Sequence, residues 1–317
     1  MAPCSTHSRQ RKIFQAAYPN GIGSLSMFNT AHSHDAAKGY EDSMHNAAYT
    51  PPETRRAGLN YVSRWLGGVS CYIAFGLGGL LSSLTILPLL RFWPGTPEAR
   101  IIRVQKAVHL MFKGFVAMLT WAGVIHVSTH RAQQLHDARG VIVIANHPSL
   151  VDVVVLISLM PNAGCIVKQG LWRNPFLRGV VSCAGYIPNR GAELMLEDCR
   201  EVLARGTNLI IFPEGTRTVV GATINDFARG AANIALRAEA DILPVVLRTN
   251  VRGLTKEQPW YEIPRQTMGM AVEIGTIVSY QKYQAALGEH AKMARQLTRD
   301  LEHYYKQQLE NNYELKQ

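Results

Sequence analysis

Residues 141–152 read VIVIANHPSLVD and contain the pattern that decides the fold. The apolar run Val141–Ala145 favours a buried β-strand. A short polar turn follows, and Val151–Leu159 then reads as a helix. A strand that passes through a turn into a helix is the repeating unit of an α/β sheet. The segment therefore predicts such a sheet, with His147 on the turn after the strand.

The same alternation continues along the chain. Further apolar runs typical of strands are Ala163–Val167, Leu209–Phe212 and Ile242–Leu247, with weaker candidates at Tyr186–Ile187 and Ala271–Ile274. Helical segments are expected at Pro175–Cys183, Ala192–Ala204 and Phe227–Glu239, and an amphipathic helix at Ala285–Leu309. We therefore predict an α/β fold whose mostly parallel sheet is flanked by helices.

Two apolar segments precede this region. Trp65–Leu90 contains no charged residue, and as a helix it would reach roughly 39 Å, enough to cross a ~30 Å hydrocarbon layer. Ile101–Val127 combines basic side chains with an apolar run, which suits a helix lying on anionic lipid. Together they predict a membrane-associated helical hairpin. Burial of the first segment in a soluble core, and packing of the second on the next domain, are the alternatives.

These patterns divide the chain into four parts. We expect an irregular tail at 1–60, the hairpin at 61–130, the α/β domain at 131–280 and the C-terminal helix at 281–317.

Composition narrows the function classes. The chain has 317 residues, of which 47% are hydrophobic, so wholesale disorder is excluded. Its 33 basic and 23 acidic residues give a net charge of +10, which favours an anionic partner. No stacking-aromatic motif accompanies the charge, so we expect no nucleic acid. Five cysteines without CxxC spacing argue against a disulfide framework or thiolate zinc site and favour a reducing compartment.

Polar residues follow the predicted strands at their carboxyl ends, where open α/β sheets bind ligands. They are His147, Lys168, Arg190, Glu214 and Arg217, and Arg248 is a further candidate. Basic side chains with one imidazole and one carboxylate predict an anion site that contains an acid–base group.

His147 and Asp152 allow two interpretations. A strand-to-helix turn can bring the carboxylate to one ring nitrogen of His147, which fixes the tautomer and makes the other nitrogen a base. Alternatively, Ser149-x-x-Asp152 is a capping box that only starts the helix. The segment by itself leaves both open.

Four blocks in order carry a family resemblance. NHPSLVD (Asn146–Asp152), GYIPNR (Gly185–Arg190), FPEGTR (Phe212–Arg217) and ILPVVL (Ile242–Leu247) resemble the 1-acylglycerol-3-phosphate acyltransferase family over roughly residues 138–250. The resemblance implies that His147 is the general base and Asp152 its orienting partner. It assigns the acceptor's phosphate and glycerol to Arg190, Glu214, Gly215, Thr216 and Arg217, with Lys168 as a further basic residue, and the acyl side of the site to Pro244.

The resemblance also implies a reaction. A membrane-associated enzyme, its site facing the cytoplasm, would move a fatty acyl group from an acyl thioester to a lysolipid hydroxyl. The favoured acceptor is 1-acylglycerol-3-phosphate, which would give phosphatidate. A lyso-ornithine lipid or glycolipid acceptor, or hydrolysis of the thioester, is the alternative. The donor is a thioester of acyl carrier protein or coenzyme A, and neither cofactor nor metal is expected.

The chain contains no serine-hydrolase elbow, which favours direct attack by the acceptor hydroxyl. Backbone N–H groups at the start of the helix after His147 are candidates to stabilise the oxyanion.

Overall fold

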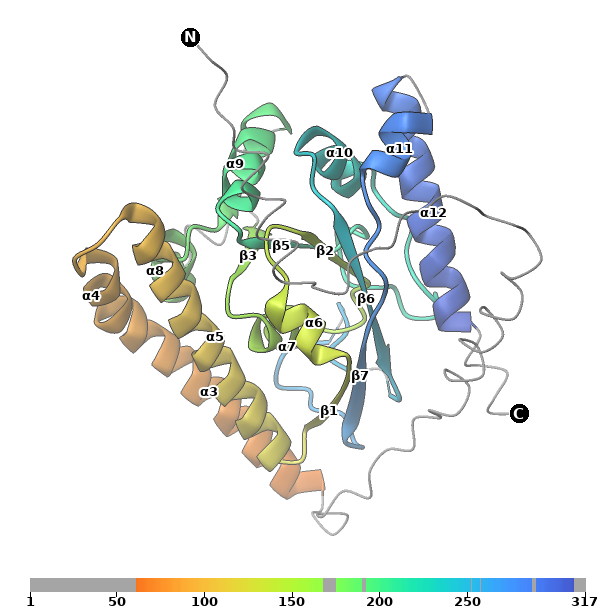
Figure 1. The fold of residues 1–317 in the computed structure, drawn as a ribbon. Helices are drawn as coiled ribbons and strands as arrows, with labels where there is room; N and C mark the ends of the chain where they lie inside the picture. Colours follow the sequence, from red (N-terminus) through yellow and green to blue (C-terminus); the bar gives the residue numbers. More distant parts are fainter. Residues whose placement is uncertain are drawn as a thin grey trace. The chain divides into compact units, whose positions relative to one another are not determined.

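The computed structural model describes residues 61–167, 175–189, 192–251, 253–256, 258–286 and 289–310. Within these residues a single sheet runs through the molecule in the order β1-β7-β6-β2-β5-β3-β4 (Figure 1). Its strands are β1 (Ile125–His130), β2 (Ile142–Ala145), β3 (Ala163–Val167), β4 (Ile187–Pro188), β5 (Asn208–Ile211), β6 (Ile242–Thr249) and β7 (Met268–Ile274). All neighbours pair in parallel except β6 and β7. The predicted mostly parallel sheet is therefore confirmed.

The sheet includes one strand that the sequence patterns did not predict. Residues Ile125–His130, assigned above to the hairpin segment, form the edge strand β1 and pair with β7. The strand begins just after α5 (Pro97–Trp121), following a turn in which Gly123 has φ 72°. Only Ile125 and Val127 contribute apolar side chains to the neighbouring core, so the strand has little hydrophobic pattern of its own.

Helices flank the sheet on both faces. They are α3 (Tyr61–Leu84), α4 (Ile86–Phe92), α5, α6 (Ala132–Asp137), α7 (Asp152–Leu159), α8 (Pro175–Cys183), α9 (Ala192–Ala204), α10 (Gly230–Arg237), α11 (Gln281–Ala286) and α12 (His290–Glu310). The predicted C-terminal helix is thus two helices. The tail at 1–60 and the last residues, 311–317, lie outside the described residues.

Alternation along β2 separates two hydrophobic cores. Val143 and Ala145 lie in the first core, with residues of α3, α4, α5, α7 and α8. Ile142 and Ile144 lie in the second, with residues of α9, α10 and α12. Side chains of a strand point alternately to opposite faces, so every position of β2 is buried. Full burial on both faces explains why this strand reads as a continuous apolar run.

The N-terminal helices share the first core with the sheet. Phe75 of α3 stacks on Phe115 of α5 with ring centroids 4.1 Å apart, so the two long helices lie side by side (Figure 1). Thr96 caps the start of α5 by accepting a hydrogen bond from the Ala99 N–H group. Buried residues occur from Val104 to Leu119, so α5 packs on the domain along most of its length.

Tyr305 of α12 enters the sheet beside a proline. Pro244 lies within the central strand β6 and has no N–H group to donate. The Tyr305 hydroxyl donates to the Ile144 carbonyl at 2.5 Å and accepts from the Val245 N–H group at 3.1 Å. The side chain is fully buried. It therefore joins α12 to β2 and β6 where the proline interrupts the sheet.

Replacing Tyr305 by phenylalanine is expected to lower the free energy of unfolding by about 1–3 kcal/mol, because two buried backbone groups lose their partner. Urea denaturation checks this. The matched variant Tyr261→Phe changes a half-exposed ring and is expected to shift stability by less than about 0.5 kcal/mol. Equal denaturation midpoints for the two variants would contradict the assignment.

Candidate active site

The sheet order brings two predicted motifs together. His147 follows β2 and the FPEGTR loop follows β5, and β2 and β5 are parallel neighbours. On the side of β2 opposite β5, Asn146 connects the end of β2 to β6. Its side-chain amide donates to the Leu247 carbonyl and accepts from the Leu247 N–H group, both at 2.8 Å. This side chain extends the β2–β6 pairing past the end of β2. His147 therefore lies just beyond the carboxyl end of the strand.

His147 and Asp152 are in direct contact. Nδ1 of His147 lies 2.8 Å from Oδ2 of Asp152, whose side chain is fully buried, while the imidazole is 20% exposed. An ionised carboxylate only accepts, so Nδ1 carries the proton and Nε2 presents its lone pair. Burial raises the pKa of the Asp152 carboxyl, and the hydrogen bonds from His147 and Ser149 oppose that rise. The geometry is that of an oriented imidazole base.

Ser149 also contacts Asp152, as the capping-box interpretation of this segment expects. Its N–H group donates to Oδ2 of Asp152 at 2.7 Å, and its hydroxyl donates to Oδ1 at 2.9 Å. Asp152 is the first residue of α7, where a carboxylate is favoured electrostatically. One carboxylate therefore holds the turn before α7 and contacts His147. The complete capping box is not formed, because the N-cap of α7 is Val151 and it has no side-chain cap hydrogen bond. The Ser149-x-x-Asp152 spacing is the signal that identifies Ser149.

The N–H groups of the turn just before α7 already have partners. The N–H groups of Ser149, Leu150 and Val151 donate to Asp152, the Leu254 carbonyl and the Ser149 hydroxyl, respectively. These three N–H groups hold the turn before α7, and the suggested oxyanion role of N–H groups at the start of the helix stays a prediction.

The FPEGTR loop surrounds His147. The Phe212 ring stacks on the imidazole with centroids 4.2 Å apart. Glu214 accepts the His147 N–H group at 2.7 Å, and the Thr218 N–H group donates to the His147 carbonyl at 2.8 Å. Thr218 and Phe212 were not singled out from the sequence, although Thr218 directly follows the motif.

Arg217 is partly committed to the backbone of another loop. Its Nη1 donates to the carbonyls of Leu254 and Thr255 at 2.9 and 2.7 Å. Leu254 has φ 55° and is fully buried, a strained conformation of the kind that occurs at functional sites. The same Leu254 carbonyl accepts the Leu150 N–H group, so one loop contacts both motifs.

Of the other predicted site residues, three are described by the structure and two are not. Lys168 and Arg190 lie outside the described residues. Gly215 has φ 67°, which glycine adopts readily, and is exposed beside half-buried Thr216. Pro244 is buried in β6, so its suggested role on the acyl side stays a prediction.

Arg248, the further candidate for the predicted anion site, is paired with a carboxylate. Its guanidinium forms a two-pronged ion pair with Glu273 of β7, at 2.9 and 3.0 Å. The antiparallel pairing of β6 and β7 brings the two side chains together. The sequence patterns did not predict which strands pair, so they did not reveal this contact.

Among the described residues, no group of three or more His, Cys, Asp or Glu side chains is arranged to hold a metal. His126 and His130 lie on β1, four residues and about 13 Å apart along the strand, too far to share an ion.

Three comparisons bear on this arrangement. Residues 126–248 match the family model described as Acyltransferase. The 1-acyl-sn-glycerol-3-phosphate acyltransferase of Helicobacter pylori (strain J99 / ATCC 700824) is 32% identical over 122 residues, which cover 37% of this chain and 52% of that protein. The enzyme of the same name from Cocos nucifera is 28% identical over 56% of each chain.

The crystal structure of the 1-acyl-sn-glycerophosphate (LPA) acyltransferase PlsC from Thermotoga maritima has the same fold. It matches with a TM-score of 0.62 at 19% identity, covering 78% of this chain and 97% of that one. The aligned parts span about half the length of the two curated relatives. The region 126–248 is thus a domain of the acyltransferase family, which confirms the resemblance inferred from the four blocks.

Proposed function

We propose that this protein is a membrane-associated O-acyltransferase that transfers a fatty acyl group from an acyl thioester to the free hydroxyl of a lysolipid, with 1-acylglycerol-3-phosphate as the acceptor. The observation that carries the proposal is the 2.8 Å contact between His147 Nδ1 and Asp152, directly beside the FPEGTR loop. The family match of residues 126–248 supports the reaction class.

The residues suit direct transfer. Nε2 of His147 takes the proton of the acceptor hydroxyl as that oxygen attacks the thioester carbonyl. The tetrahedral intermediate expels the thiolate, and the imidazolium returns the proton to the leaving sulfur. The new ester and the free thiol account for all the atoms. A thiolate with an ordinary pKa near 8.5 leaves with little assistance.

The acceptor's phosphate is assigned to three basic residues of the predicted anion site, Arg217, Lys168 and Arg190. The remaining N–H groups of Arg217 can donate to phosphate oxygens, since among the described residues only its Nη1 has backbone partners. Lys168 and Arg190, which follow β3 and β4 in sequence, belong to the same proposal because both strands run parallel to β2 and β5.

One experiment tests the reaction and the acceptor together. Purified protein is incubated with a panel of lysolipids and with coenzyme A and acyl carrier protein thioesters, and products are identified by mass spectrometry. Phosphatidate from 1-acylglycerol-3-phosphate is the expected product. Free fatty acid without a new lipid would identify a hydrolase, and acylation of another lysolipid alone would replace the acceptor.

The N-terminal helices support attachment to a membrane. Tyr61–Phe92 is the one described segment long and apolar enough to cross a bilayer. Ile73, Leu77 and Leu81 recur at helical spacing on α3 and are each more than half exposed. Such a continuous apolar stripe in water marks a contact with a partner or with lipid.

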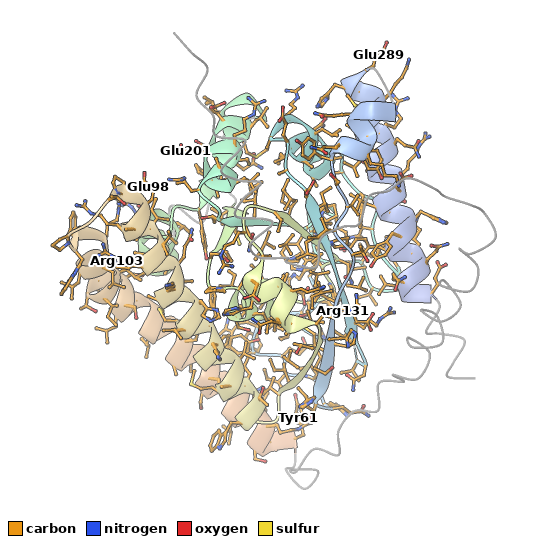
Figure 2. The ribbon with its side chains drawn as sticks, in the orientation of Figure 1. Tyr61, Glu98, Arg103, Arg131, Glu201 and Glu289 are labelled. Carbon is orange, nitrogen blue, oxygen red and sulfur yellow. The ribbon has the colours of Figure 1, made fainter. Side chains whose placement is uncertain are left out.

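We propose that the helix pair formed by α3 and α5 lies along the membrane surface. Gly68 near the start of α3 packs against Ile263, and Ser83 near its end packs against Gly179 of α8. Tyr61 and Arg103 mark opposite ends of the pair in Figure 2. A perpendicular crossing would draw the attached α/β domain into hydrocarbon, where its polar surface is unfavourable. A site facing the cytoplasm is part of this proposal.

Replacing Leu77 and Leu81 together by glutamate is expected to reduce partitioning onto phosphatidylglycerol-containing vesicles by at least about 100-fold. Each buried leucine contributes roughly 1.5–3 kcal/mol to such binding. Co-sedimentation measures the effect. Leu194→Glu, at an exposed leucine of α9, is the matched control and is expected to bind like the wild type. Undiminished pelleting of the double variant would contradict attachment through α3.

A further inference from the structure

Glu214 faces the protein rather than an open site. Its residue surface is 8% exposed, and both carboxylate oxygens already accept protein donors. Oε1 accepts the His147 N–H group at 2.7 Å, while Oε2 accepts the Asn225 N–H group and the Thr218 hydroxyl, each at 2.8 Å. A carboxylate engaged in this way has little capacity left for a glycerol hydroxyl.

The three donors come from segments that meet only in the folded chain. His147 follows β2, whereas Thr218 and Asn225 belong to the loop between β5 and α10. Asn225 closes that loop, because its side chain accepts from the Val219 N–H group and donates to the Arg217 carbonyl. Glu214 therefore connects the loop between β5 and α10 to the turn that contains His147.

His147 is held at both of its backbone polar groups. Its N–H group donates to Glu214, and its carbonyl accepts from the N–H group of Thr218 at 2.8 Å. Phe212 stacks on the ring, and Asp152 fixes Nδ1. With the backbone pinned, the direction of Nε2 is determined by rigid contacts rather than by a free side-chain rotation.

We infer that Glu214 is a positioning residue for the base His147, acting with Thr218, and is not a ligand of the acceptor. This inference rests on the proposed function, because it concerns the base of that reaction. It replaces the acceptor-binding role that the family resemblance implies for Glu214. A displacement of about 1 Å at a reacting group costs roughly 10²-fold in rate, which sets the expected effect.

The kinetic test separates the two roles of Glu214. At saturating donor, Glu214→Ala is expected to lower kcat about 100-fold and to leave KM for 1-acylglycerol-3-phosphate within about threefold. Glu214→Gln keeps one oxygen that can accept the His147 N–H group, so it is expected to recover about tenfold of that loss. Thr218→Val, at a buried side chain, is expected to lower kcat about fivefold with the same unchanged KM. Glu201→Ala, an exposed glutamate of α9 labelled in Figure 2, is the control.

A KM raised tenfold or more in both Glu214 variants, with kcat retained and Thr218→Val like the wild type, would overturn the inference. Amide hydrogen exchange gives a readout that needs no turnover. The peptide containing residues 146–152 is expected to exchange about tenfold faster in Glu214→Ala than in Glu201→Ala, because the His147 N–H group loses its acceptor. Unchanged exchange in that peptide would also overturn it. If the wild type acylates no lysolipid, the proposed function fails while this measurement still decides the role of Glu214.

Discussion

His147→Ala is expected to lower kcat for acyl transfer by about 10³-fold, within the 10²–10⁴-fold range that a positioned general base contributes. The lipid hydroxyl is a weak acid, and the imidazole is the group that Asp152 orients at 2.8 Å. KM for the acceptor is expected to stay within about threefold, because the phosphate is assigned to other side chains. Steady-state kinetics with 1-acylglycerol-3-phosphate and an acyl thioester measures both constants.

The chain contains a matched control for this variant. His136 also pairs with a neighbouring carboxylate, Asp137, at 3.0 Å, but it lies exposed on α6. His136→Ala is expected to keep wild-type kinetics. Comparable turnover for the His147 and His136 variants would remove His147 from the chemistry. An acyl group trapped covalently on the protein would instead contradict direct attack.

Asp152→Asn is expected to lower kcat by about 10²–10⁴-fold, almost as much as loss of the imidazole. The carboxylate holds the proton on Nδ1 of His147, and an amide that turns its NH₂ group toward the ring would move that proton to Nε2. Nε2 then has no lone pair to accept the acceptor's proton. Nitrogen chemical shifts of the imidazole, together with kcat, check both the tautomer and the rate.

Stability must be measured with this variant, because Asp152 also holds the turn before α7 through Ser149. Asn is accepted at helix starts, so we expect a loss of no more than about 1–2 kcal/mol. Asp137→Asn, at an exposed His–Asp pair, is the control. Full activity of folded Asp152→Asn would show that the carboxylate serves only to hold the turn before α7.

Local sequence decided the arrangement of His147 and Asp152. Both lie on one strand–turn–helix unit, and five residues of chain suffice to fold the carboxylate back onto the ring. The apolar runs predicted the buried strands because β2 is covered on both faces. FPEGTR directly follows a predicted strand, so the sequence also predicted that it would lie with His147 at the carboxyl ends of the strands. These features depend on short stretches of chain, so the printed sequence is enough to infer them.

Only the tertiary structure decided what Glu214, Arg217 and Arg248 contact. Glu214 meets the His147 N–H group, 67 positions away in the chain, and Arg248 meets Glu273 across an antiparallel pair. A charged side chain binds whichever buried donors or acceptors the folded chain brings near it, because leaving those groups unpaired costs free energy. Sequence therefore predicted the pairing of His147 with Asp152, whereas the fold determined which groups the surrounding charged side chains contact.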